Sequence, residues 1–286
     1  MLLPVNAALA VVMAVLLAAA VAGAAWARFK DARGRRRYWK DIGAAGLRAT
    51  LQLGAVSLLI GSVIRVLPLS LAFMMLMFAV ATRTAGRRIT ADATWKWAAA
   101  PIAAGVIPVL AMLTLTGLVP LEGLALIPVA GILIGGALTA TVLAGRRALD
   151  ELRDRRGEVE AALALGFPDR DARTEIARPA ASEALIPGLD QTRTVGLVTL
   201  PGAFVGMLLG GSSPVQAGAV QLFVLIALMA VQTVAVAVTL ELVTRGLLRG
   251  TEAGSRAAGA KRLPGGLLGP VPGLGRYLPK ARSSAP

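Results

Sequence analysis

Cysteine and histidine are both absent from the 286 residues of this sequence. Their absence excludes disulfide bonds, thiolate and imidazole metal sites, and haem bound through histidine. A metal ion that contacts this chain must be held by oxygen ligands, by methionine sulfur or through water. The residues present define no set of metal ligands, so the sequence leaves any metal site unassigned.

Aromatic residues are also scarce, at 4% of the chain, whereas 56% of the residues are hydrophobic. The mean hydropathy is +0.70, and a soluble domain of this length would need far more polar surface. Alanine, leucine, valine and glycine dominate, which suits closely packed transmembrane helices, because small residues let backbones approach. The composition therefore indicates an integral membrane protein surrounded by a lipid bilayer.

Acidic residues number 16 against 30 basic ones, which gives a net charge of +14. Such a charge can indicate nucleic-acid binding. Here the basic residues occupy short segments between apolar spans, as the positive-inside rule predicts for cytoplasmic loops. We therefore expect no nucleic-acid partner.

The apolar segments predict an all-α, polytopic membrane protein with about seven transmembrane helices, since roughly 20 apolar residues cross a bilayer core. The expected spans are 2–27, 41–64, 66–82, 97–118, 124–144, 194–211 and 215–242. Seven spans with the N-terminus outside place every Lys/Arg cluster, and the C-terminus, on the cytoplasmic side. Positive charge follows the first span rather than preceding it, so we expect a retained helix and not a cleaved signal peptide.

These spans are expected to form one transmembrane domain over 1–248, in a multi-pass protein of the cell (cytoplasmic or inner) membrane. The remainder, 249–286, is basic and rich in glycine and proline. We expect it to be a disordered cytoplasmic tail.

The longest polar segment between spans lies at about 150–190. Glu158–Leu165 favours a helix, Gly166 can end that helix in the left-handed conformation, and Asp169 can begin a second one. We expect two short helices meeting at a glycine elbow, where an exposed Leu165 or Phe167 could enter a groove of a partner. From the residues alone, a plain amphipathic loop at the membrane interface remains the alternative interpretation.

The spacing in this segment resembles the EAA loop of ABC-transporter permeases, whose pattern is E-A-A, three residues, G, nine residues, I-x-L-P. Arg178 departs from the pattern, which prefers leucine there. In such permeases this loop forms the coupling helix that docks on the ATPase subunit. The resemblance implies that role for Glu160, Ala161, Ala162, Leu165, Gly166, Phe167, Ile176 and Pro179.

Three further stretches, Gly46–Leu53, Ile127–Gly131 and Thr192–Gly202, are similar to the FetB-type family of iron-export ABC transporter permeases. The similarity extends over about 40–248, and the run TVGLVTLPG is its most specific part. This resemblance implies a permease subunit of an ATP-driven exporter whose ATPase is a separate chain. It also implies a homodimer of this chain with two ATP-binding subunits.

The sequence contains no phosphate-binding loop of the form G-x-x-x-x-G-K-[ST]. The nearest pattern, at 254–261, has Ala260 where the lysine is required. We therefore expect a transport subunit rather than an enzyme. It should bind no cofactor of its own, and ATP and Mg²⁺ should bind to the partner ATPase.

Polar residues within apolar spans are candidates for a translocation path, because they are costly unless they face the bundle interior or water. The candidates are Arg48, Gln52, Asp190, Thr194 and Gln221. Each has a plainer alternative, since Arg48 can snorkel to the interface, Asp190 can pair with Arg193, and glutamines can join helices by hydrogen bonds.

Small residues and prolines mark candidate points of helix packing or bending. Gly131 and Gly135 have the GxxxG spacing of packed transmembrane helices. The full set of candidates is Gly131, Gly135, Pro201, Gly202 and Gly206.

The cargo is not evident from the residues, because without cysteine, histidine and many intramembrane carboxylates no high-affinity iron site stands out. We expect export of iron or another metal. The same ABC architecture carrying a nucleotide sugar or another solute is one alternative. A stand-alone secondary carrier or channel is another, since broken helices such as 194–211 occur in carriers.

Overall fold

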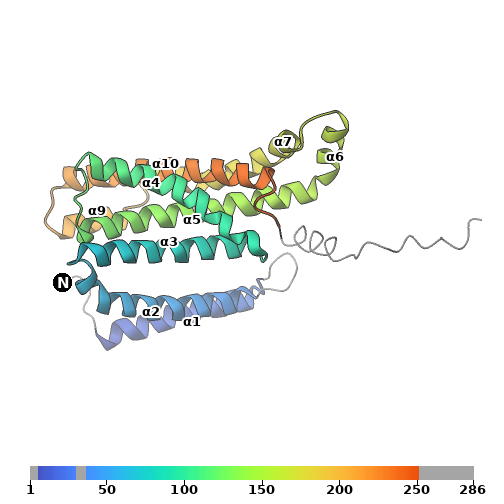
Figure 1. The fold of residues 1–286 in the computed structure, drawn as a ribbon. Helices are drawn as coiled ribbons and strands as arrows, with labels where there is room; N and C mark the ends of the chain where they lie inside the picture. Colours follow the sequence, from blue (N-terminus) through green and yellow to red (C-terminus); the bar gives the residue numbers. More distant parts are fainter. Residues whose placement is uncertain (1–5, 30–36, 251–286) are drawn as a thin grey trace, which may run out of the picture. The chain divides into compact units, whose positions relative to one another are not determined.

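The structure, a computed structural model, describes residues 6–29 and 37–250. Within these ranges the regular structure is helical, and one isolated bridge joins Val195 and Thr199. The helices are α1 (Ala7–Trp26), α2 (Tyr38–Val63), α3 (Leu67–Ile89), η1 (Ala93–Ala98), α4 (Ala99–Leu115), α5 (Gly123–Asp154), α6 (Arg156–Ala164), α7 (Asp169–Ser182), η2 (Glu183–Leu185), α8 (Ile186–Thr194), α9 (Gly202–Leu209) and α10 (Pro214–Thr244) (Figure 1). The predicted all-α class is confirmed.

Among the described residues, six helical segments are long and apolar enough to cross a membrane. They are α1, α2, α3, the joined η1 and α4, α5, and α10. Their apolar windows have mean hydropathies between 1.3 and 2.5. Six of the seven expected spans therefore correspond to long helices, and the chain is a multi-pass membrane protein. The start of the first expected span and nearly all of the expected tail lie outside the described residues.

The remaining expected span, 194–211, is predicted to be a broken helix, and in the structure it is not a continuous helix. α9 has 8 residues, about 12 Å of helix, which is too short to cross a bilayer core. Between α8 and α9 the backbone turns at Gly196, whose φ is +82°, and the N–H of Val198 donates to Thr194 O at 2.9 Å. Pro201 follows immediately before α9 and has no N–H to continue a helix.

The C-terminal end of α10 lies next to α7. Arg170 of α7 forms an ion pair with Glu241, near the C-terminal end of α10. The 31 residues of α10 form a helix about 46 Å long. α10 is therefore more than long enough to cross a bilayer core of about 30 Å.

The described residues divide into two compact units, and α3, α4, α5 and α10 each contribute to both. The first unit comprises residues up to 81, 103–137 and 201–231. Its buried cluster is built on Leu113, Val119 and Leu126. A Cβ added to Gly105 would lie 2.7 Å from the carbonyl oxygen of Val231, so α4 and α10 are in backbone contact there.

The paired helices α1 and α2 belong to the first unit (Figure 1). A Cβ added to Gly46 would lie 2.6 Å from Leu17. The side chain of Asn6 caps α1 by accepting a hydrogen bond from the N–H of Leu9 at 3.0 Å. Small residues on α2 therefore let α1 pack closely against it.

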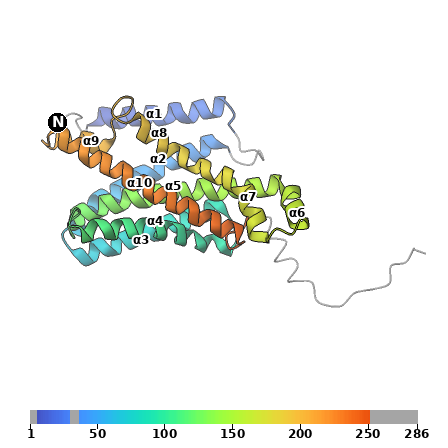
Figure 2. The same cartoon turned by 90° about the horizontal axis from the view of Figure 1, so that it is seen from above.

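The second unit comprises 82–102, 138–200 and the residues from 232 onward. Glycines again mark its tightest contacts. A Cβ on Gly86 would lie 2.1 Å from Trp95 O, and one on Gly188 would lie 2.1 Å from the side-chain oxygen of Gln232. This unit contains α6 and α7, which Figure 2 shows joined end to end by a tight turn.

Candidate functional site

The polar segment folds as the two predicted helices, α6 and α7, joined at an elbow formed by Leu165–Pro168. The end of α6 is a Schellman motif. The N–H of Phe167 donates to Ala162 O at 3.1 Å, and the N–H of Gly166 donates to Leu163 O at 3.0 Å. Gly166 has φ +90°, a conformation that side chains disfavour. The glycine was therefore correctly identified as the end of the first helix.

The second helix begins where predicted, at Asp169. Pro168 precedes it with extended backbone, and Asp169 and Asp171 lie in its first turn. Acidic side chains near a helix N-terminus interact favourably with the helix dipole. This local chemistry accounts for the sharp start of α7.

Two large apolar side chains project from the elbow. Leu165 is 80% exposed and Phe167 is 53% exposed. A Cβ added to Gly166 would meet nothing within 4 Å, so the tip of the elbow is open. Exposed apolar groups in a polar segment are suited to a hydrophobic groove on another molecule.

The side of α7 away from the tip is fixed to the body of the second unit. Small buried residues, among them Ala177 and Ala181, line its inner face. Arg170 donates from Nε and Nη2 to both carboxylate oxygens of Glu241 at 2.8 Å. Arg245 donates to the same carboxylate at 2.5 Å. The carboxylates of Glu241 and Asp171 raise the pKa of Arg170 above its ordinary value. α7 and α10 are thus joined by a bidentate ion pair.

A second ion-pair group lies at the bend between α5 and α6. Arg155 donates to Glu151 at 3.2 Å and to Glu158 at 2.7 Å. Hydrogen bonding from Arg155 holds the pKa of Glu158 below its ordinary value. The guanidinium therefore connects the last turn of α5 to the first turn of α6.

The remaining residues of the EAA-like pattern lie along α6 and α7 rather than at the tip. Glu160 accepts a hydrogen bond from Arg156 at 2.8 Å. Ala161 is exposed and Ala162 is half-buried, while on α7 Ile176 is half-buried and Pro179 is exposed. The tip itself is built from Leu165, Gly166 and Phe167. The docking role of all these residues stays a prediction.

The five path candidates differ in burial. Arg48 and Gln52 are exposed on α2, Asp190 is exposed on α8, and Thr194 is half-buried. Gln221 is 5% exposed, and its Oε1 has no hydrogen-bond partner within the described part of the chain. Gln221 is therefore the candidate that best fits an internal polar site.

The packing candidates also differ from one another. A Cβ on Gly131 would lie 3.0 Å from Met77, whereas those on Gly135, Gly202 and Gly206 would meet nothing within 4 Å. Pro201 is the N-cap residue of α9. The tightest helix contacts occur at other glycines that sequence reasoning missed, namely Gly46, Gly86, Gly105, Gly123, Gly145 and Gly188.

Some polar features of the structure were not predicted from the sequence. The hydroxyls of Thr82 and Thr141 are buried without a hydrogen-bond partner in the described ranges. Residues 6–29 and 37–250 contain no group of three or more acidic side chains arranged to hold a metal ion. The two buried hydroxyls had no sequence signal, since isolated threonines are common in apolar helices.

Fold and site together define a polytopic helical membrane protein with an apolar elbow on a polar helical pair. The chain belongs to the Uncharacterised protein family (UPF0014), whose sequence profile matches residues 7–248.

Named relatives occur in plants and bacteria. The chain is 38% identical to the membrane protein STAR2 of Oryza sativa subsp. japonica over 55% of this chain and 56% of that one. It is 37% identical to Protein ALUMINUM SENSITIVE 3 of Arabidopsis thaliana over 52% and 55% of the two chains. It is 30% identical to the Probable iron export permease protein FetB of Escherichia coli K12 over 65% and 73%. The chain thus matches little more than half the length of the plant relatives, and no solved structure shows significant similarity to it.

Proposed function

We propose that this chain is the membrane-spanning subunit of an ATP-driven exporter of iron or another metal ion. A separate ATPase chain supplies the energy by docking on the elbow of α6 and α7. Membership of the family supports this proposal, as does the similarity to the bacterial Probable iron export permease protein FetB. The observation that carries it is the exposed pair Leu165 and Phe167 at a conformationally fixed turn.

The contacts of α7 suggest how force from the ATPase reaches the membrane helices. A push on the elbow tip acts on α7 as a lever, because its inner face is packed and Arg170 is paired to Glu241. Movement of α7 therefore changes the position of the end of α10. Close-packed helices respond to such a push by shifting between discrete arrangements rather than by deforming continuously.

We further propose that two copies of this chain assemble with two ATPase chains in the cell membrane. ATP and Mg²⁺ bind to the ATPase subunits. The permease contributes the path, for which the buried and unpaired Gln221 is the first residue to test.

Co-purification tests the docking site. We expect Leu165→Asp/Phe167→Asp to abolish co-purification with the proposed ATPase subunit and to abolish ATP-dependent metal efflux. Both side chains are exposed, so the double variant should still insert and fold. Arg178→Asp is a matched control, because it changes the net charge by the same amount on the exposed side of α7. Normal assembly and efflux in the double variant would contradict the docking assignment.

A proline substitution at Gly166 tests whether the backbone conformation of the elbow is required. Gly166→Pro cannot adopt φ +90°, because the proline ring fixes φ near −65°. We expect a folded permease that no longer transports. An intact complex with normal export would show that the elbow does not couple the subunits.

The cargo needs its own measurement. We expect iron or another metal ion to stimulate ATP hydrolysis by the purified complex in proteoliposomes. A flat response to metals alongside stimulation by another solute would replace the cargo while leaving the ABC architecture in place.

One observation favours a different class, a stand-alone secondary carrier. The irregular turn between α8 and α9 is the kind of broken helix from which carriers build ion sites. Transport by the purified chain alone, driven by an ion gradient and without any ATPase, would establish that alternative.

A further inference from the structure

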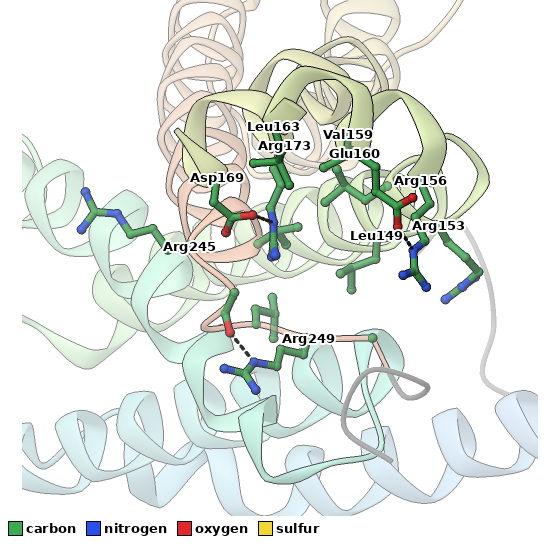
Figure 3. A pocket seen from close by; sticks show the side chains of 15 residues that line it. Leu149, Arg153, Arg156, Val159, Glu160, Leu163, Asp169, Arg173, Arg245 and Arg249 are labelled. Carbon is green, nitrogen blue, oxygen red and sulfur yellow. Dashed lines mark hydrogen bonds and ion pairs between the residues drawn. The ribbon is translucent and has the colours of Figure 1, made fainter. Parts of the chain in front are cut away.

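A cavity of about 740 Å³ lies within the second unit, on the inner side of the α6–α7 pair. Its walls come from the end of α5, from α6 and α7, and from the last turn of α10 with the segment up to Gly250. This volume lies in the range of ligand pockets, about 300–1,000 Å³. Figure 3 shows Leu149 within the cavity and charged side chains around it.

The charge of the lining is strongly positive. Five arginines and two carboxylates line the cavity. The arginines are Arg153, Arg156, Arg173, Arg245 and Arg249. Arg245 turns away from the others in Figure 3 and pairs with Glu241. The other four arginines share the lining with two carboxylates, Glu160 and Asp169.

Three of these guanidinium groups are held in the same way, through Nε. Arg156 Nε donates to Glu160 at 2.8 Å, and Arg173 Nε donates to Asp169 at 2.9 Å. Arg249 Nε donates to the carbonyl oxygen of Gly246 at 2.6 Å. Within 6–29 and 37–250, the Nη groups of these three arginines have no hydrogen-bond acceptor. Each guanidinium is thus oriented by its inner nitrogen, and its outer donors are available.

Available Nη pairs match a particular ligand chemistry. Guanidinium forks bind the oxygens of phosphate groups in a bidentate manner, and several forks together can satisfy one phosphate. Figure 3 shows Arg156 and Arg173 reaching down from α6 and α7, and Arg249 entering from the segment after α10. The apolar part of the lining, including Leu149, Leu163 and Leu248, suits a ligand that also carries a hydrophobic portion.

We propose that this cavity binds an anionic phosphate ester through Arg156, Arg173 and Arg249. The phosphate lies between the three forks, and the apolar portion of the ligand lies against the leucines. The group can come from the headgroup of an anionic phospholipid or from a soluble phosphate ester. Because the forks come from α6, α7 and the end of α10, the bound phosphate ties the elbow to α10. Its effect on transport rests on the proposed function, whereas the binding itself does not.

Native mass spectrometry of the purified full-length chain in detergent tests the binding. The probes are dioleoylphosphatidylglycerol, glycerol 3-phosphate and, as the uncharged match, dioleoylglycerol. We expect one or both phosphate probes to give saturable one-to-one binding and dioleoylglycerol to give none. Binding of the phospholipid alone identifies a lipid ligand, and binding of glycerol 3-phosphate identifies a soluble one.

Arg249→Gln is the sharpest variant, because the Nε partner of Arg249 is a carbonyl oxygen and its loss leaves no carboxylate unpaired. We expect its phosphate affinity to fall by about tenfold, the cost of one charged hydrogen-bonding group. Arg178→Gln on the exposed side of α7 is the control and should bind as the unchanged protein does. Equal unfolding temperatures of the two variants establish that both are folded.

Three results would overturn the proposal. They are no saturable phosphate binding at millimolar concentration, equal binding of dioleoylglycerol, and equal affinities of Arg249→Gln and Arg178→Gln. If phosphate fails to bind but Arg249→Gln loses assembly with the ATPase, the cavity is instead a contact for an acidic segment of that partner. That result would refute the phosphate site while leaving the proposed function intact.

Discussion

At the residue scale, Gly166 is the point where sequence and structure agree most closely. The order of a helix-forming run, a glycine and a phenylalanine–proline pair is enough to predict a helix end, because only local backbone chemistry is involved. Other decisive glycines could not be recognised in this way. Gly105 and Gly188 lie within helices and face neighbours that are distant in the chain, so nothing beside them in the sequence marks their role.

Replacing Gly166 by alanine tests the backbone requirement by itself. No atom lies within 4 Å of the added Cβ, so the cost comes only from φ +90°. We expect a loss of about 1–2 kcal/mol in the stability of the elbow. It should appear as faster hydrogen exchange at the end of α6. Gly218→Ala, an equally uncrowded helical glycine in α10, is the control and should not loosen its helix. Unchanged exchange at the elbow in Gly166→Ala would contradict the strain argument.

The pair of Arg155 and Glu158 gives a pH dependence whose sign follows from the lowered pKa of Glu158. A carboxylate with a depressed pKa in the folded protein stabilises it above the unfolded pKa of about 4.3. That contribution disappears as the pH falls through the lower folded pKa. Arg155→Gln should therefore lower the unfolding temperature near pH 7, and the difference should shrink as the pH falls below about 4.

Arg178→Gln is the control, because it removes one positive charge from the same polar segment. Arg178 forms only a long ion pair, 3.9 Å from Glu175, so little stabilisation is lost with it. Its difference from the unchanged protein should be small at every pH. A difference for Arg155→Gln that persists undiminished to pH 3 would show that Arg155 stabilises the bend by packing rather than by charge.

At the scale of elements, composition located the long apolar helices, and the Pro201–Gly202 pair marked 194–211 as broken, which hydropathy alone does not do. The stretch 194–211 contains enough apolar residues for a crossing, yet the turn at Gly196 and the proline at 201 divide it. Hydropathy averages over such breaks, because it counts side chains and ignores backbone hydrogen bonds. The cavity lined by α6 and α7 could not be predicted from the sequence either, because its lining comes from segments that are far apart in the chain. Arg249 follows α10, and only tertiary folding brings it to the same cavity as Arg156.

The contact between α4 and α10 depends on the absence of a side chain at Gly105. An added Cβ would lie 2.7 Å from the carbonyl oxygen of Val231, and this backbone atom cannot move like the end of a flexible side chain. We expect Gly105→Ala to destabilise the protein by about 1–3 kcal/mol through overpacking. Unfolding in detergent measures the loss. Gly218→Ala is again the control. A neutral or stabilising effect at Gly105 would mean that α4 moves away from α10 at little cost.

The ion pair between α7 and α10 predicts a coupling between two elements. Arg170→Ala and Glu241→Ala should each lower the unfolding temperature by roughly 1–3 °C, and the double variant should fall by less than the sum. Arg170 is also the group that connects the elbow to the membrane helices in the proposed function. Its removal should therefore reduce efflux per ATP hydrolysed more than it reduces ATPase binding. Strictly additive stability effects would show that the two helices are held by packing alone.

At the scale of the whole molecule, the distribution of Lys and Arg predicts sidedness, which the fold does not establish. All the basic clusters fall on one side only if the stretch between α7 and α10 crosses the membrane. The fold supplies six long helices and one broken segment. The six long helices by themselves would place both termini on the same side of the membrane. If the broken segment is a seventh crossing, the termini lie on opposite sides. Irregular backbone at membrane depth is tolerated only where protein or water surrounds it, so the two arrangements differ physically.

Cysteine labelling distinguishes these arrangements, and the absence of native cysteine means that single-cysteine variants need no other change. The three sites are Leu165→Cys at the elbow, Leu121→Cys between α4 and α5, and Ser213→Cys between α9 and α10. All three positions are exposed. We expect a membrane-impermeant maleimide to label Leu121→Cys and Ser213→Cys in intact cells and to label Leu165→Cys only after permeabilisation. If Ser213→Cys instead behaves like Leu165→Cys, the segment through α8 and α9 does not cross the membrane. α10 would then cross from the cytoplasmic side to the outside, and the basic residues that follow it would lie outside, against the positive-inside rule.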